Sequence, residues 1–194
     1  MELTHNQNML LDVVEMARGS FHTVIIATGR RSGKGFMEVE LINRRVEMLK
    51  TGKIERYPLL NMATPDIIVF CVARTEWFMP ILRERLEYEF GDKITFNGDG
   101  FELDDFASDG SPIKIFIAVK SIRGNDRYDN PYAPLMIFDE YAGDDDHDIN
   151  DVFLPKSSTM KVVFTTDLPT SKVRKDVLML KVKNSSVNSW IDDE

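Results

Sequence analysis

The sequence predicts an α/β fold in which a mostly parallel sheet is flanked by helices, and three observations lead to it. Short runs rich in β-branched residues alternate along the chain with segments of helical periodicity. These runs are apolar at successive positions, which is typical of parallel strands buried on both faces. The chain has 194 residues, of which 43% are hydrophobic and 29% charged, enough for one domain with its own core. We expect a single domain over residues 1–194, because no segment has the composition of a linker.

Three segments repeat apolar residues at the spacing of an amphipathic helix. They are residues 7–17, 33–50 and 75–90. Gly52 lies just past the second segment and Gly91 ends the third, as expected of residues that stop a helix. Pro80 lies early in the third segment, where a proline can distort a helix.

Six apolar runs are expected to form strands, at residues 23–27, 67–72, 113–119, 135–138, 161–165 and 177–182. Residues 93–104 predict a small hairpin whose turn runs from Asn97 to Gly100. Helical patterns separate several of the strands. Connections of this kind join parallel strands and place helices against both faces of the sheet.

The excess of acidic over basic residues limits how the protein can bind nucleic acid. Lys and Arg number 24 against 32 Asp and Glu, so the formal net charge is -8. Nucleic acid would therefore be bound by a local basic surface and not by the field of the whole protein. The single cysteine, Cys71, excludes an intrachain disulfide and is expected to pack in the core. No apolar run approaches the roughly 20 residues of a membrane span, so no membrane partner is expected.

A candidate phosphate loop lies between the first predicted strand and the second predicted helix. It consists of Thr28, Gly29, Arg30, Arg31, Ser32, Gly33, Lys34 and Gly35. Small residues let backbone N–H groups surround a phosphate, the helix N-terminus adds its positive dipole end, and Lys34 would reach the β- and γ-phosphates. Two positions depart from the usual loop: Thr28 replaces the first glycine, and Gly35 replaces the Ser or Thr that binds Mg²⁺. An ordinary glycine-rich turn is the alternative.

Two acids follow the predicted strand 135–138. Asp139 and Glu140 would lie at its carboxyl end, the edge at which open α/β sheets bind ligands. Asp139 would hold Mg²⁺ and Glu140 would polarise the water that attacks the γ-phosphate of ATP. A strand that runs into a solvated acidic loop is the alternative. Together the two motifs predict a P-loop ATPase of the additional-strand type with a catalytic glutamate, in which a third strand separates the two motif-bearing strands.

The chain resembles the ATPase domain of large terminase subunits, the DNA-packaging motors of tailed phages. Arg30 matches an arginine in the Walker A loop of that family, and Gln7 matches the glutamine of its adenine-contacting segment. Residues 72–75 resemble the next strand–helix element and residues 121–124 the segment before the Walker B strand. Residues 162–166 resemble the motif that couples hydrolysis to movement, although Asp167 follows it here.

This resemblance implies a role for several residues and partners. Gln7 would help to place adenine, Arg30 would contact the γ-phosphate in cis, and Thr165 or Thr166 would sense the hydrolysed state. The work done would be translocation of double-stranded DNA into a viral capsid in the host cytoplasm. The expected partners are further copies of the chain in a homo-oligomeric ring, the capsid portal, and a small terminase subunit or a separate nuclease. The family's C-terminal nuclease domain is not expected within residues 1–194.

Other polar residues have a functional and a simpler interpretation. Arg123 or Arg127 would serve a neighbouring subunit's nucleotide as a trans arginine finger, but we slightly favour solvated loop residues. The acidic run from Asp144 to Asp148, with His147, would offer ligands to a divalent ion. Consecutive residues do not converge on one centre without a special turn, so a solvated loop is favoured there.

Two other functional classes remain open. A helicase-like or other DNA-remodelling ATPase would share these motifs but would need a second motor domain. A non-hydrolysing scaffold that binds nucleotide is the other class. Gly35 supports it, whereas Lys34, Asp139 and Glu140 oppose it.

Overall fold

The computed structural model of the chain describes most of the helices and strands that the sequence predicts. The described residues are 3–18, 20–21, 23–29, 32–54, 66–98, 100–121, 133–139, 160–166, 177–184 and 189–191.

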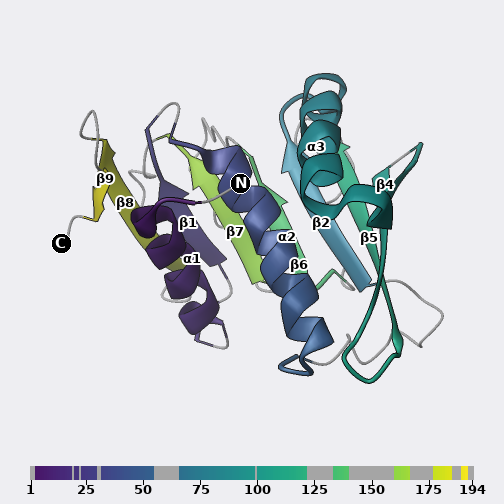
Figure 1. The fold of residues 1–194 in the computed structure, drawn as a ribbon. Coiled ribbons are helices and arrows are strands. Elements are labelled where there is room, and N and C mark those ends of the chain that lie inside the picture. Colours follow the sequence, from purple (N-terminus) through teal and green to yellow (C-terminus); the bar gives the residue numbers. More distant parts are fainter. Residues whose placement is uncertain are drawn as a thin grey trace.

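In this described part of the chain, nine strands form one sheet in the order β3-β4-β5-β2-β6-β7-β1-β8-β9 (Figure 1). The strands are β1 Thr23–Ala27, β2 Asp66–Val72, β3 Ile94–Asn97, β4 Gly100–Phe106, β5 Pro112–Ser121, β6 Leu135–Phe138, β7 Met160–Thr165, β8 Val177–Asn184 and β9 Ser189–Ile191. The six central strands from β5 to β8 are parallel, and the pairs β3–β4, β4–β5 and β8–β9 are antiparallel. The prediction of a mostly parallel sheet is therefore confirmed.

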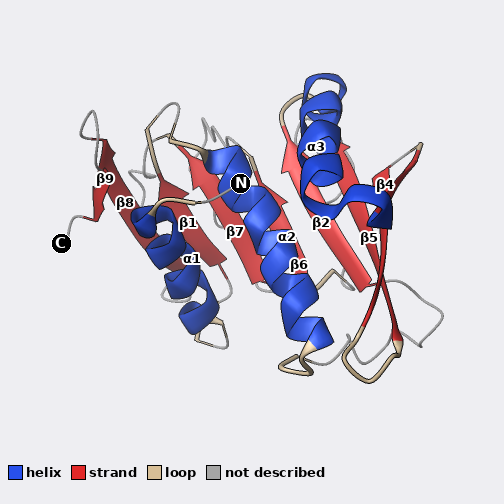
Figure 2. Ribbon diagram, viewed as in Figure 1, coloured by secondary structure: helices blue, strands red, loops and turns tan. Residues whose placement is uncertain are grey.

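The described α-helices are α1 His5–Ala17, α2 Lys34–Lys50 and α3 Thr75–Phe90, and a short 3-10 helix, Gly91–Lys93, follows α3. All three α-helices lie against the same face of the sheet (Figure 2), so the described part of the chain does not show the predicted helices on the other face. Thr4 starts α1 with a capping box that it forms with Gln7. The helix α3 continues across Pro80, its sixth residue, although a proline there cannot donate the helical hydrogen bond to the carbonyl of Glu76. None of the described helices is both long enough and apolar enough to cross a membrane.

Side chains are buried on both faces of the sheet. The larger core lies under the helices and includes Leu11, Ile42 and Phe70. The opposite face buries a second cluster that includes Cys71 and Phe138, because successive side chains of a strand point to opposite faces. Burial raises the pKa of the Cys71 thiol to about 12, so this residue packs in the core as predicted.

The strand β7 lies between β1, which precedes the candidate phosphate loop, and β6, which precedes the acidic pair. The predicted separation of these two strands by a third is thus confirmed. The hairpin predicted at 93–104 is present as β3 and β4, but it is not an isolated unit. Its second strand pairs with β5 from Gly100 to Phe106, so the hairpin extends the edge of the main sheet.

A buried ion pair connects α2 to the sheet. The Nε of Arg45 donates to Oδ2 of Asp66 at 2.8 Å, and one Nη lies 2.7 Å from the same oxygen. The two side chains are 3% and 0% exposed. Asp66 is the first residue of β2, so the pair fixes the middle of α2 against the start of that strand. Burial lowers the pKa of Arg45, although Asp66 opposes this shift.

Candidate active site

The candidate site lies at the carboxyl ends of β1, β7 and β6. Ala27, the last residue of β1, is paired with Thr165 at the end of β7, and Phe138 at the end of β6 is paired with Val163. The residues that follow these strands, including Thr28 and Asp139, therefore share one edge of the sheet. This is the edge at which open α/β folds bind ligands.

Two hydrogen bonds fix the start of the candidate phosphate loop. The backbone N–H of Thr28 donates to the carbonyl of Thr165 at 3.0 Å, which ties the loop to the end of β7. The hydroxyl of Ser32 donates to Oγ1 of Thr28 at 2.8 Å across the loop. Thr28 is buried, and its hydroxyl closes the loop, which explains why a threonine stands where the usual motif has glycine.

Gly33 is required by the backbone and by its neighbour. It precedes α2 with φ 80°, a left-handed conformation that favours glycine. A Cβ at this position would also overlap with the side-chain amide of Gln7. That amide donates from Nε2 to the carbonyl of Ser32 at 2.9 Å, while its Oε1 accepts from the N–H of Thr4 at 2.8 Å. Gln7 therefore joins the start of α1 to the phosphate loop, a structural contact beside the adenine role expected of it.

Four charged side chains lie close together next to the loop: Lys34, Glu38, Arg85 and Asp139. Lys34 is the first residue of α2 and is buried, and Glu38 follows it by one helical turn with 0% exposure. Burial raises the pKa of Glu38 well above its ordinary range, and the nearby carboxyl of Asp139 raises it further. Arg85 and Lys34 lower that pKa but do not cancel the shift. Glu38 and Arg85 were not among the residues predicted from the sequence.

The glycine at position 35 has a steric explanation. A Cβ built on Gly35 would overlap with the guanidinium of Arg85, which reaches this turn of α2 from α3. The same guanidinium lies 5.3 Å from the ring centre of Phe36, a favourable cation–π distance. Arg85 thus takes the space that the Ser or Thr side chain of an ordinary phosphate loop would fill.

Asp139 follows β6 directly and is half-buried. Its backbone N–H donates to the carbonyl of Cys71 at 3.1 Å, which extends the pairing of β6 with β2 by one residue. No group of three or more His, Cys, Asp or Glu able to hold a metal occurs among the described residues. Mg²⁺ usually takes only one or two protein carboxylates together with phosphate oxygens and water. Asp139 beside Glu38 fits that kind of site.

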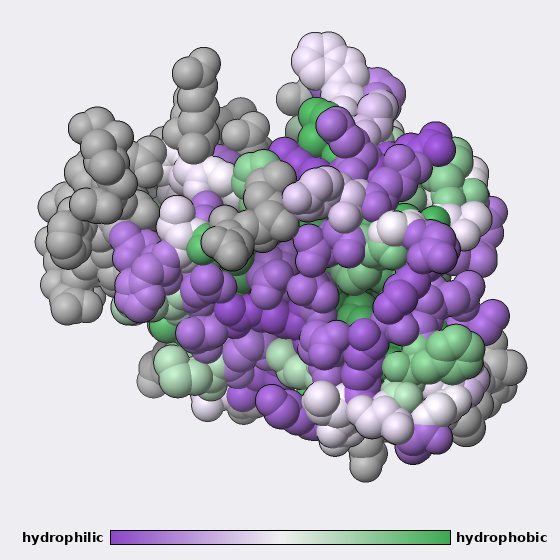
Figure 3. Space-filling model, viewed as in Figure 1, coloured by the Kyte–Doolittle hydropathy of each residue, from purple (hydrophilic) through white to green (hydrophobic). Residues whose placement is uncertain are grey.

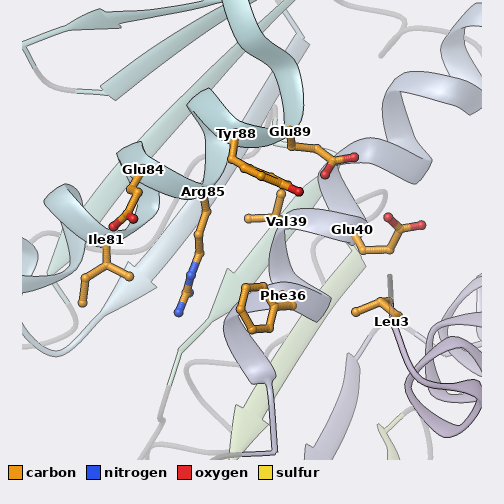
Figure 4. Close-up of a pocket in the computed structure, with 9 residues that line it drawn as sticks. All are labelled: Leu3, Phe36, Val39, Glu40, Ile81, Glu84, Arg85, Tyr88 and Glu89. Carbon is orange, nitrogen blue, oxygen red and sulfur yellow. The ribbon is translucent and has the colours of Figure 1, made fainter. Parts of the chain in front are cut away.

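A pocket of about 310 Å³ adjoins the loop. It lies between α2, α3 and the segment before α1, and Figure 4 shows the side chains of Phe36, Arg85 and Tyr88 around it. The remaining lining residues are Leu3, Val39, Glu40, Ile81, Glu84 and Glu89. Figure 3 shows a largely hydrophilic surface on the helix-covered face, with a hydrophobic recess between α2 and α3. A mainly aromatic and aliphatic lining with a few charged groups is the composition of a small-molecule pocket.

The other predicted site residues are only partly described. Thr165 is buried and Thr166 is exposed at the end of β7. Gly29 lies directly after Thr28 in the described part of the loop. The predictions for the remaining positions fall outside the described residues: Arg30, Arg31, Glu140, Arg123, Arg127 and the acidic run from Asp144 to Asp148.

Comparisons with known proteins agree on the fold. No protein-family model and no curated protein matches the sequence. The structure is similar to the large terminase ATPase domain of Thermus phage P74-26, with a TM-score of 0.56 and 12% identity over 93% of this chain and 80% of that domain. It is also similar to the large terminase of a second, thermophilic bacteriophage, with a TM-score of 0.55, 12% identity and 93% of this chain covered.

The chain spans 46% of that second terminase in this comparison. Another structure of the same thermophilic phage protein, in complex with ADP, gives a TM-score of 0.54 at 14% identity over 93% of this chain and 45% of that protein. The predicted resemblance to the ATPase domain of large terminases is therefore confirmed at the level of the fold.

Proposed function

We propose that this chain is an ATP-hydrolysing motor domain of the large terminase type, which drives double-stranded DNA into a viral capsid in the host cytoplasm. The observation that carries the proposal is the grouping of Lys34 and Asp139 beside a glycine-containing loop at the carboxyl edge of the sheet. This grouping lies in the fold of terminase ATPase domains, and one of the structurally similar terminases was solved with ADP.

The phosphates of ATP would be bound by the backbone N–H groups of the loop, the N-terminus of α2 and the ammonium of Lys34. Mg²⁺, when bound, would neutralise charge on the β- and γ-phosphates. Asp139 would hold this ion from the end of β6. Glu140 would orient and polarise the water for in-line attack on the γ-phosphate.

The Thr28–Thr165 hydrogen bond supports a path from the phosphate loop to the coupling segment. A shift of the loop on phosphate release would move the end of β7 with it, because the backbone of Thr28 is bonded directly to that strand. Gln7 would place adenine, Arg30 would act in cis, and Arg123 or Arg127 would act in trans within a ring of identical chains. The ring would work with a capsid portal and with a small terminase subunit or a separate nuclease.

Phosphate release from ATP, measured with and without double-stranded DNA, tests the proposal. Lys34→Ala and Glu140→Gln should each lower the rate by about 100-fold or more, because each removes a group that acts on the reacting phosphate or water. Glu140→Gln should still bind ATP. Lys53→Ala is the matched control, since Lys53 is an exposed lysine beyond the end of α2 and should leave the rate unchanged.

Three outcomes separate the functional classes. Stimulation by duplex DNA, lost in both site variants, supports the packaging motor. Far stronger stimulation by single strands would favour a helicase-like ATPase. Equally slow release by the wild type and Glu140→Gln, with ATP bound by both, would indicate a nucleotide-binding scaffold.

A further inference from the structure

The metal-binding hydroxyl of an ordinary phosphate loop is missing at position 35. In that motif the Ser or Thr after the lysine places its hydroxyl on Mg²⁺. Gly35 has no side chain, and the guanidinium of Arg85 lies against it. The usual second protein ligand is therefore absent, and the space for its side chain is closed in this structure.

Glu38 is the residue one helical turn beyond Gly35, on the same face of α2. Side chains of an α-helix lean toward its N-terminus, so a glutamate at this position extends back over the turn that contains Gly35. Its neighbours agree with this placement. Lys34 and Arg85, which flank or contact Gly35, both act on the carboxyl of Glu38.

The carboxylate of Glu38 is buried without a hydrogen-bond donor among the described residues. Glu38 is 0% exposed, and neither of its carboxylate oxygens accepts a hydrogen bond within the described part of the chain. The carboxyl of Asp139 lies close enough to share a proton with it. Two ionised carboxylates at that separation repel each other unless a cation or a proton lies between them.

We propose that Glu38 replaces the missing hydroxyl and, together with Asp139, holds the divalent cation that accompanies the bound nucleotide. The inference rests on the proposed ATP site. Two carboxylates from the protein, with phosphate oxygens and water, make a ligand set that Mg²⁺ accepts. Before nucleotide and metal bind, Lys34 and Arg85 offset the negative charge of the pair.

The test is a binding titration with a fluorescent ADP analogue, in EDTA and in Mn²⁺, on the full chain. Mn²⁺ should tighten binding to the wild type, and electron paramagnetic resonance should detect the ion on the protein–nucleotide complex. Glu38→Gln and Asp139→Asn should keep binding in EDTA but lose about tenfold or more of the metal effect, since even indirect partners of a metal contribute about 10–100-fold. Glu47→Gln, an exposed site on the same helix, should behave as the wild type.

The outcomes separate this inference from the proposed function. If the wild type binds the analogue and Glu38→Gln retains the full Mn²⁺ effect, Glu38 is no ligand and the inference is overturned, while the nucleotide site stands. If the wild type binds no analogue in either condition, the proposed function is overturned together with the inference. Glu38→Asp keeps the charge with a side chain shorter by one methylene. It should lose part of the metal effect, which tests the same point if Glu38→Gln does not fold.

Discussion

Two regions of α2 bury a charged side chain, and they satisfy it in opposite ways. In the middle of the helix, Arg45 donates a hydrogen bond to Asp66 and forms an ion pair with it, and both side chains are almost fully buried. Near the start of the helix, Glu38 is equally buried, but its oxygens accept no hydrogen bond from the described residues. One charge has a bonded counterion in the chain. The other lies next to a second carboxyl group, that of Asp139, and is only partly offset by Arg85 and Lys34.

This difference between Arg45 and Glu38 indicates that the first buried charge has a structural role and the second a functional one. An ion pair formed within the protein fixes two elements against each other and needs no ligand, although Oδ1 of Asp66 accepts no hydrogen bond from the described residues. A buried carboxylate without a donor lowers stability in the free protein, so it is expected where a ligand completes it. The comparison therefore predicts opposite responses when each charge is removed.

The largest effect should come from breaking the Arg45–Asp66 pair. Arg45→Met leaves Asp66 buried without its counterion, which should lower the free energy of unfolding by about 3–5 kcal/mol. Urea denaturation measures this loss. The double variant Arg45→Met/Asp66→Leu removes both charges and should recover much of the stability. A loss below about 1 kcal/mol in the single variant would contradict a structural role for the pair.

Glu38→Gln should act in the opposite direction when neither nucleotide nor metal is present. The amide replaces a carboxyl group whose ionisation is disfavoured by burial and by Asp139, and it can donate to Asp139, so the free energy of unfolding should rise by about 1 kcal/mol at neutral pH. Thermal or urea unfolding in EDTA measures this change.

The pH dependence of that difference follows from the raised pKa of Glu38. Above about pH 4.3, where an unfolded glutamate loses its proton, the folded wild type still binds it. The folded state then holds more protons than the unfolded state, so the stability of the wild type falls as the pH rises toward the folded pKa. The variant lacks this titration, and its advantage should grow over the same interval. Parallel pH profiles for the two proteins would contradict the buried, unsatisfied carboxyl.

Much of the fold was predictable because its signals are local. The runs 23–27 and 67–72 are apolar at every position or nearly so, and they form central parallel strands. The helical periods ended close to Gly52 and Gly91, where α2 and α3 end. The union of the hairpin with β5 was missed, because pairing across a sheet edge depends on strand order and not on the pattern of one segment.

The sequence predicted only those residues of the candidate site that belong to the phosphate loop or to the acidic pair after β6. Gly33, Lys34 and Asp139 were identified because their spacing follows two known chemical requirements. Glu38 was missed because one acid among the apolar residues of a helix has the same local pattern as a solvated one. Arg85 was missed because its contact with Gly35 joins two helices 50 residues apart in the chain. The sequence did hold one signal for Glu38, namely the glycine at position 35 in place of the Mg²⁺-binding Ser or Thr. An acid one helical turn further along α2 is the simplest substitute for that missing ligand.

The smallest effect is expected at the far end of α2, where the charge is paired but only partly buried. Lys50, the last residue of the helix, lies 2.9 Å from Asp105 of β4, and the side chains are 24% and 10% exposed. Burial raises the pKa of Asp105, but hydrogen bonds from Lys50, from the backbone of Phe106 and from Lys93 outweigh it, so the net shift is downward.

Asp105→Asn should therefore lower the free energy of unfolding by about 1 kcal/mol or less at neutral pH, because solvent screens a pair of this kind. A depressed pKa contributes stability above the unfolded value and loses it as the pH falls, so wild type and variant should converge in acid. Urea denaturation at neutral and acidic pH measures both points. A loss as large as that of Arg45→Met would show that exposure does not set the strength of the pairs along α2, and the contrast drawn from Glu38 and Arg45 would then need another cause.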